Sequence, residues 1–351
     1  MSERTYRRQF DEYCDFPSLN AELIATATAT HAAIAVMDCT FIAKSGKHTN
    51  GLDQFYNGSH SRVERGLELS LFGVVDVVTQ TGYALTAMQS AAKAEFPELS
   101  RIDQAIDDLE RHRHHLPPQV RYLAVDGFYA KAEFVDAAVA LKLEVVSKLR
   151  RDANLRYLYT GEQKPRGARR KYAGKVDLSA PEGFEPVDEV QPGVMLYSGL
   201  VWHITLKRQV RLAYLQDNRK AAKTSYVVLF SSDVQQSALE VYQFYKLRFQ
   251  IEFVFRDAKQ YTGLSDAQAR SAKKLDYHFN ASLLALNLAK YEILEAQGNA
   301  QPIVFSMASC KRRALNEHLL EAFIAKLDLS PSLIKSHPNY PNLCSYGILA
   351  A

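Results

Sequence analysis

The stretch "YQFYKLRFQIEFVFRDAKQYTGL", residues 242–264, mixes apolar and charged side chains at helical spacing. On a helical wheel of about 100° per residue, one face collects apolar side chains, namely Phe244, Leu247, Ile251, Val254, Phe255 and Ala258. A separate stripe, roughly 80° wide, holds Glu252 together with Tyr245, Arg248, Arg256 and Lys259. We therefore predict a helix that packs on a sheet with one face and presents one acid, three cations and a phenol on another.

The charged stripe has two explanations. Arg248 and Arg256 each lie four residues from Glu252, so the stripe could be a salt-bridged surface. Such pairs contribute only a few tenths of a kcal/mol each, and a single glutamate needs only one partner. Three cations and a tyrosine favour instead a surface that binds a polyanion, and Glu252 would then have a separate function.

Two further acids interrupt apolar segments. Asp38 lies in the predicted strand 32–43, and Asp126 closes the predicted strand 120–126. The carboxyl end of a sheet strand is a common place for a catalytic or metal-binding group. An acid that caps the following turn is the alternative for each, and for Asp126 the next residue, Gly127, favours a turn.

The order of predicted elements indicates an α/β fold. Strands are expected at 32–43, 66–79, 82–90, 120–126 and 143–150, and helices at 100–114, 129–142 and 275–296, while 44–61 is expected to be a loop. Three successive strands followed by alternating helices and strands predict a mixed sheet with helices on its faces. Residues 151–235 change character, because Gly, Pro, Arg and Lys come first and short strand patterns follow. We interpret this segment as a β-rich insertion.

Composition sets limits on the function. The 351 residues are 47% hydrophobic and 23% charged, which suits one large domain with an insertion, or two domains. A net charge of +4 permits a nucleic-acid partner without demanding one. Four scattered cysteines without a C-x-x-C pair argue against a zinc site or a disulfide framework. We expect a reducing compartment, with neither a signal peptide nor a membrane span.

The spacing Tyr245-x2-Arg248-x3-Glu252-x6-Lys259 resembles the Y-R-E-K signature of a group of bacterial insertion-sequence transposases. These are DDE enzymes with a ribonuclease-H-like catalytic core. The segments "VMDCTFIAKSGKHTNGLD" and "YLAVDGFYAK" resemble the family segments that hold the first and second aspartates. The resemblance runs from about residue 30 to about residue 290.

The resemblance implies a ribonuclease-H-like mixed sheet flanked by helices and interrupted by the β-rich insertion. The core would comprise residues 32–150 and 236–300, and the insertion residues 151–235. Residues 1–31 would be a lead-in, the possible stub of a DNA-binding region, and residues 301–351 a C-terminal helical region. Asp38, Asp126 and Glu252 would be the catalytic residues and would hold two Mg²⁺ ions, for which Mn²⁺ could substitute. Asp38 would bridge the two ions.

The implied substrate is double-stranded DNA, both the terminal inverted repeats of the transposon and the target. Strand cleavage and strand transfer would achieve cut-and-paste transposition through hairpin ends, by a homodimer assembled on DNA in the bacterial cytoplasm, at the nucleoid. Tyr245, Arg248, Arg256 and Lys259 would bind DNA phosphates. Some relatives use an insertion-domain tryptophan to stack a flipped base, a role open to Trp202; a sheet-face aromatic is the alternative. The six cations of the loop 164–175 are expected on the DNA backbone or in solvent.

One departure keeps a second function open. Asp38 is preceded by only 37 residues, whereas the relatives usually carry a longer helical region that helps to recognise the terminal repeats. The alternative is therefore a truncated transposase remnant that binds DNA without specific end recognition.

Overall fold

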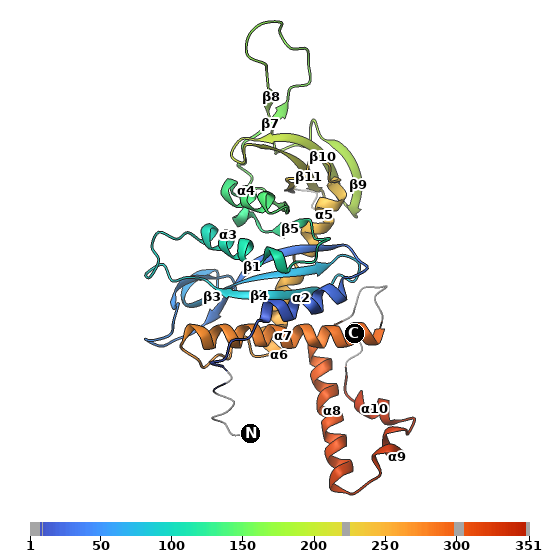
Figure 1. Ribbon diagram of the computed structural model, residues 1–351. Coiled ribbons are helices and arrows are strands. Elements are labelled where there is room, and N and C mark those ends of the chain that lie inside the picture. Colours follow the sequence, from blue (N-terminus) through green and yellow to red (C-terminus); the bar gives the residue numbers. More distant parts are fainter. Residues whose placement is uncertain (1–7, 9, 220–224, 298–304, 349–351) are drawn as a thin grey trace.

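A mixed sheet flanked by helices organises the computed structural model, which describes residues 8, 10–219, 225–297 and 305–348 (Figure 1). The strand order is β2-β3-β1-β5-β6-β12-β11-β10-β7-β8, with β4 paired to β3 and β9 paired to β10. β1, β5 and β6 are parallel, and the remaining pairs are antiparallel. The first six strands are β1 (Ala33–Ala43), β2 (Asp53–Asn57), β3 (Arg62–Asp76), β4 (Gly82–Gln89), β5 (Tyr122–Val125) and β6 (Glu144–Lys148).

Strand alternation divides the core between the two faces of the sheet. In β1, Ala35 and Met37 pack in the cluster that includes helix α3 (Arg101–His112) and helix α4 (Ala132–Ala140). Ile34, Val36 and Ile42 point to the opposite face, where the later helices cover the sheet. Asp38 has the same parity as Val36, so it projects toward those later helices.

The strands of residues 151–235 continue the same sheet. They are β7 (Leu155–Leu158), β8 (Tyr172–Lys175), β9 (Glu185–Gln191), β10 (Val194–His203), β11 (Arg208–Asp217) and β12 (Ser225–Ser231). β12 pairs antiparallel with β6, which joins this group to the parallel strands. The loop between β7 and β8 extends away from the rest of the molecule at the top of Figure 1.

Helices from both ends of the chain, α2 (Phe16–Ala27) and the long α7 (Ala272–Gln297), pack against β4 and on each other (Figure 1). α2 contributes Ile24 and Ala27 to the cluster that includes α3 and α4, whereas most of the buried side chains of α7 belong to the cluster on the face that Asp38 approaches. Asn280 and Asn287 of α7 hydrogen-bond to the backbone of β4, through Ala87 and Ala84 respectively. The remaining helices are α5 (Ala238–Leu247), α6 (Gln250–Tyr261), α8 (Met307–Lys326), α9 (Pro331–Lys335) and α10 (Tyr340–Cys344), with short 3₁₀ turns η1 (Arg113–His115) and η2 (Gly127–Tyr129).

The structure corrects two details of the sequence analysis. The expected loop 44–61 contains β2, which pairs with the start of β3. The single helix expected over 242–264 is two helices, α5 and α6, separated by a turn at Arg248 and Phe249. The apolar face predicted for this stretch is buried as expected, with each of its six side chains at most 9% exposed.

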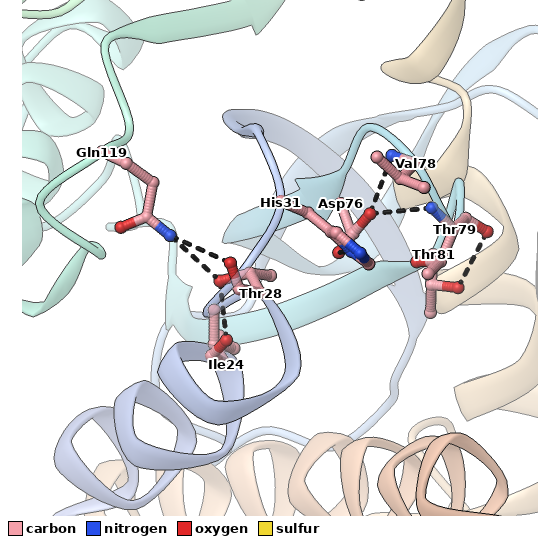
Figure 2. A network of polar contacts seen from close by, with 8 residues as sticks. All are labelled: Ile24, Thr28, His31, Asp76, Val78, Thr79, Thr81 and Gln119. Carbon is pink, nitrogen blue, oxygen red and sulfur yellow. Dashed lines mark hydrogen bonds and ion pairs between the residues drawn. The ribbon is translucent and has the colours of Figure 1, made fainter. Parts of the chain in front are cut away.

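A buried carboxylate fixes the β3–β4 turn to the end of α2 (Figure 2). Asp76 is 0% exposed and accepts hydrogen bonds from the backbone N–H groups of Val78 and Thr79, each at 2.8 Å. The His31 Nδ1 lies 2.8 Å from the other oxygen of Asp76. Beside it, Gln119 donates to the Thr28 carbonyl at 3.1 Å. The acid at the end of β3 therefore has a structural role.

Among the described helices, none is long and apolar enough to cross a membrane.

Candidate active site

Two aspartates are neighbours at the carboxyl ends of parallel strands. β1 and β5 run in register with Met37 opposite Val125, and the next residues along the two strands are Asp38 and Asp126. Alternation places both side chains on the sheet face covered by α6. Asp126 Oδ1 accepts from the Phe128 N–H at 2.9 Å, and so also caps η2. Asp126 therefore caps the following turn and also lies next to Asp38.

Arg248 joins the first aspartate to the glutamate of α6. Its Nη1 donates to Asp38 at 2.7 Å, and its Nη2 donates to Glu252 at 3.2 Å. The guanidinium lies against the rings of Tyr245 and Phe249, with centroid distances of 5.6 and 4.8 Å. The turn between α5 and α6 places Arg248 so that it can reach both acids, and the structure therefore brings Asp38, Asp126, Tyr245, Arg248 and Glu252 together.

The charged groups of this cluster are partly buried, and this burial shifts their pKa values. Burial is the main cause that raises the pKa of Asp38 to about 6, Arg248 opposes that shift, and Asp126 and Glu252 add to it. The Arg248 side chain is only 7% exposed, whereas Glu252 is 49% exposed. The Arg248 Nε is buried and has no hydrogen-bond partner among the described residues. The buried Arg248 guanidinium therefore pairs with the carboxylates of Asp38 and Glu252 and also interacts electrostatically with Asp126.

The donor set suits a hard divalent cation. Three carboxylates supply oxygen ligands of the kind that Mg²⁺ prefers. Within the described part of the chain, however, no three acidic, histidine or cysteine side chains are already arranged to hold a metal ion. The Arg248 guanidinium lies between Asp38 and Glu252, in the place where positive charge is needed. An ion held by Asp38 and Glu252 would require this guanidinium to shift.

The other two cations of α6 differ in how freely they could meet a ligand. Lys259 donates to the Thr40 hydroxyl and the Phe41 carbonyl, both at 2.8 Å, so it ties α6 to β1. Arg256 is 55% exposed and pairs with Asp257 at 3.0 Å. Both cations line a hollow of about 610 Å³ that also contains Asp38, Glu252 and the β2–β3 turn.

The remaining predicted DNA-binding groups lie elsewhere. Trp202 is on β10, partly buried, 6.1 Å between ring centroids from Tyr172 of β8, and it lines neither hollow beside Asp38. The cations of the β7–β8 loop are exposed at the far end of the molecule (Figure 1). The structure does not bring Trp202 or this loop to the carboxylates.

A group of residues that the sequence analysis did not single out borders the site. β2 supplies Phe55 and Tyr56, β3 supplies Glu68, and α3 supplies Arg101, which forms an ion pair with Glu68. Glu68 is only 9% exposed. The signal that could have revealed it is the same as for Asp38, an acid within the apolar strand pattern "GLELSLF" at 66–72.

Comparisons with known proteins add the following. A family model described as "Transposase DDE domain" matches residues 79–288, which include Asp126 and Glu252 and begin after Asp38. No curated protein matches the sequence. Among solved structures, the chain is similar to a piggyBac transposase in a synaptic complex with hairpin DNA, with 11% identity and a TM-score of 0.45. That match covers 93% of this chain and 60% of the piggyBac chain.

Proposed function

This chain belongs to the family of transposase DDE domains, and on that premise we propose that it is a DNA transposase that cleaves and joins DNA strands with the help of divalent metal ions. One observation carries the proposal. Asp38 and Asp126 stand side by side at the ends of parallel strands, and Arg248 links Asp38 to Glu252. A sheet and a helix that are distant in sequence thus bring three acids to one place.

We propose that Asp38, Asp126 and Glu252 hold two Mg²⁺ ions, with Asp38 shared between them and Mn²⁺ as a substitute. Bound there, the ions would activate the oxygen nucleophile, first water and then a DNA 3′-hydroxyl, and stabilise the leaving oxygen. The protein contributes the carboxylates and a partly buried setting that excludes much of the solvent. Arg248 would turn from the acids toward a phosphate of the cut strand, where its planar fork suits two phosphate oxygens.

The DNA would approach along the hollow that contains Glu252, Arg256 and Lys259. Exposed Arg256 is the cation best placed to contact a phosphate, and Tyr245 lies beside Arg248. Farther away, the β7–β8 loop carries Lys164, Arg166, Arg169, Arg170 and Lys171, which suit the DNA backbone at a distance from the cut. Trp202, half-buried on β10, remains a candidate for stacking on a flipped base.

The finer assignments are also proposals. They are a ribonuclease-H-like core at 32–150 and 236–300, an insertion at 151–235, a lead-in at 1–31 and a C-terminal region at 301–351. They further include membership of the bacterial Y-R-E-K group and action on transposon ends through hairpin intermediates at the nucleoid. A homodimer on DNA is supported by exposed apolar side chains that lie four residues apart on α8, namely Leu315, Leu319 and Phe323.

A plasmid assay tests the central proposal. We expect the protein to nick supercoiled DNA, preferably DNA that carries the flanking terminal repeats, only when Mg²⁺ or Mn²⁺ is present. Glu252→Gln and Asp126→Asn should each abolish nicking, because each removes a ligand charge without a change in size. Glu110→Gln, an equivalent change at an exposed position of α3, should leave nicking intact. Nicking that survives in Glu252→Gln, or that needs no divalent ion, would overturn the proposal.

The second candidate, a protein that binds DNA without specific end recognition, gives a different pattern. Its binding would be sensitive to salt and equal for DNA with and without terminal repeats. It would not cut at the repeats, although its three carboxylates are in place.

A further inference from the structure

The hollow that contains Glu252 has two walls of different origin. One wall is α6, which contributes Glu252 and Arg256. The second wall consists of Tyr56 and residues 57–59, at the end of β2 and in the turn before β3. The end of β1, with Asp38, also lines the hollow. None of the three proposed metal ligands lies on the second wall.

The second wall presents no charge to the hollow. The residues that it contributes are all neutral, namely Tyr56, Asn57, Gly58 and Ser59. Arg62 and Glu64, at the start of β3, do not line the hollow. Glu68, farther along β3, does line it, but its charge is paired with Arg101. A polyanion in the hollow would therefore meet the cations of α6 on one side and would not be repelled by the second wall.

Two hydroxyl groups of the second wall are uncommitted. Tyr56 is 58% exposed, and its hydroxyl has no hydrogen-bond partner among the described residues. Ser59 donates its backbone N–H to Asn57 Oδ1 at 3.0 Å, but its hydroxyl has no partner within the described chain either. Serine and tyrosine hydroxyls are common donors to the phosphate oxygens of DNA. Both groups are therefore available to a phosphate in the hollow.

Hydrogen bonds hold the turn behind this wall in one shape. Glu64 accepts from Asn57 Nδ2 and from Arg62 Nε, each at 2.6 Å, and His60 Nδ1 lies 3.0 Å from the same carboxylate. These hydrogen bonds, that of Asn57 first, lower the pKa of Glu64 to about 2. Ser61 has a φ of 52°, in the left-handed region that few residues other than glycine adopt. Such a turn is preorganised, as a surface that positions a ligand needs to be.

Gly58 leaves open space in the same wall. A Cβ atom at this position would meet no other atom within 4 Å, and the backbone is not in the left-handed region. Neither the turn nor its neighbours therefore require a glycine here. A glycine that lines a hollow lets the backbone of a ligand approach closely. A larger side chain at Gly58 would occupy that space without disturbing the fold.

We propose that the second wall guides the DNA strand that is cut, with Tyr56 and Ser59 as donors to its phosphates. Gly58 would let the strand pass, and Arg256 would contact it from the opposite side. The inference rests on the proposed DNA-cleaving function. A hollow of about 610 Å³ takes one strand and not a double helix. Glu64 would be a positioning residue, because it touches the turn and not the strand.

A change of bulk at Gly58 tests the path of the strand. The full chain would be mixed with a fluorescein-labelled duplex that carries the flanking terminal repeat, with Ca²⁺ in place of Mg²⁺, and binding would be followed by anisotropy. We expect Gly58→Leu to bind about tenfold more weakly than Gly58→Ala, because only the longer side chain blocks the hollow. Both variants should keep the native melting temperature, since the added atoms enter open space. Equal, native-like affinities would overturn the proposal.

Neutral phosphates locate the two hydroxyl contacts. Methylphosphonates would replace, one at a time, the phosphates on either side of the cut in each strand. In the native protein, one or two replacements in the cut strand should weaken binding about tenfold. The same replacements should cost clearly less in Tyr56→Phe and in Ser59→Ala, because a donor is already lost. Tyr346→Phe, at an exposed position after α10, should keep the full effect. Effects that are equal in the two strands, or unchanged in both hydroxyl variants, would refute the contacts.

The positioning role of Glu64 has its own readout. Glu64→Gln weakens the bonds that hold the turn, so it should raise KM for plasmid nicking and leave kcat close to native. Glu185→Gln, an exposed position of β9, should change neither. A fall in kcat with an unchanged KM in Glu64→Gln would contradict this role. Glu252-dependent nicking by the native protein is measured separately: its absence refutes the transposase assignment, whereas intact nicking with native-like wall variants refutes only the second wall.

Discussion

Arg248 and Asp38 form a 2.7 Å ion pair across 210 residues of sequence. The same guanidinium also reaches Glu252, so it reduces the repulsion between acids that the fold brings together. A cation at this position compensates the buried charge of Asp38 in the protein without bound metal. The arginine of the Y-R-E-K pattern therefore has a structural task in addition to its proposed contact with DNA.

Removal of this arginine should destabilise the folded protein. In Arg248→Met the buried stem is kept and the charge is lost, which leaves Asp38 without its cation. We expect a loss of about 1–3 kcal/mol in the free energy of unfolding without divalent ions, measured by urea denaturation. Asp38→Asn combined with Arg248→Met should recover part of that loss, because the uncompensated charge is gone. Additive effects in this double-mutant cycle would contradict the coupling.

Magnesium should stabilise the Arg248→Met protein more than the native one. In the native protein a bound ion must displace the guanidinium, whereas in the variant the carboxylates have no competing cation. The shift in melting temperature on addition of Mg²⁺ should therefore be larger for the variant. Adding Glu252→Gln to the variant should shrink the shift again. The idea fails if Mg²⁺ raises the melting temperature of both proteins equally.

Much of this site can be predicted from the sequence, because its signals are local. An acid in an apolar strand, as at Asp38, and a charged row beside an apolar row, as around Glu252, are patterns of neighbouring residues. The turn at Arg248 cannot be predicted from such a pattern, because the helical spacing of apolar residues continues unbroken from α5 through the turn into α6. β2 was missed because its short segment is half exposed and gains its order from pairing with β3. The ion pair of Glu68 with Arg101 joins β3 to α3, so no pattern of neighbouring residues predicts it.

Asp76 should be important for stability and not for catalysis. In Asp76→Ala two backbone N–H groups and His31 lose their acceptor in a fully buried place. We expect a loss of about 2–4 kcal/mol in the free energy of unfolding. Asp188→Ala, at an exposed position of β9, should cost far less. Below the melting temperature, the folded Asp76→Ala protein should still nick plasmid DNA at close to the native rate, and a complete loss of nicking would refute a purely structural role.

The apolar row on α8 should mediate self-association. Leu319 and Phe323 are each 56% exposed and lie on one face of the helix with Leu315. Leu319→Glu combined with Phe323→Glu should yield a monomer in analytical ultracentrifugation with DNA present, because charges replace the apolar contact. His318→Glu, an exposed position beside the row, should leave the assembly unchanged. A native protein that stays monomeric on DNA at all concentrations would rule out the proposed homodimer.

Stability should fall in mild acid because of His203. Burial lowers the pKa of this histidine to about 4, and its Nδ1 accepts from the Leu206 N–H at 3.2 Å. A base whose folded pKa lies below its unfolded value stabilises the fold fully above about pH 6.5, and that contribution is lost as the pH falls toward 4. Between pH 7 and pH 5 the native protein should therefore lose about 2 kcal/mol more than His203→Asn. That variant keeps an acceptor near the Nδ1 position without the titration.

Denaturation curves at the two pH values measure the difference, with the exposed His48→Gln as a control that should behave like the native protein. The half-buried His112, whose pKa is also lowered to about 4 mainly by burial, adds the same loss to every variant and so cancels from the comparison. Equal losses in native protein and His203→Asn would show that the His203 ring is not kept neutral by its burial.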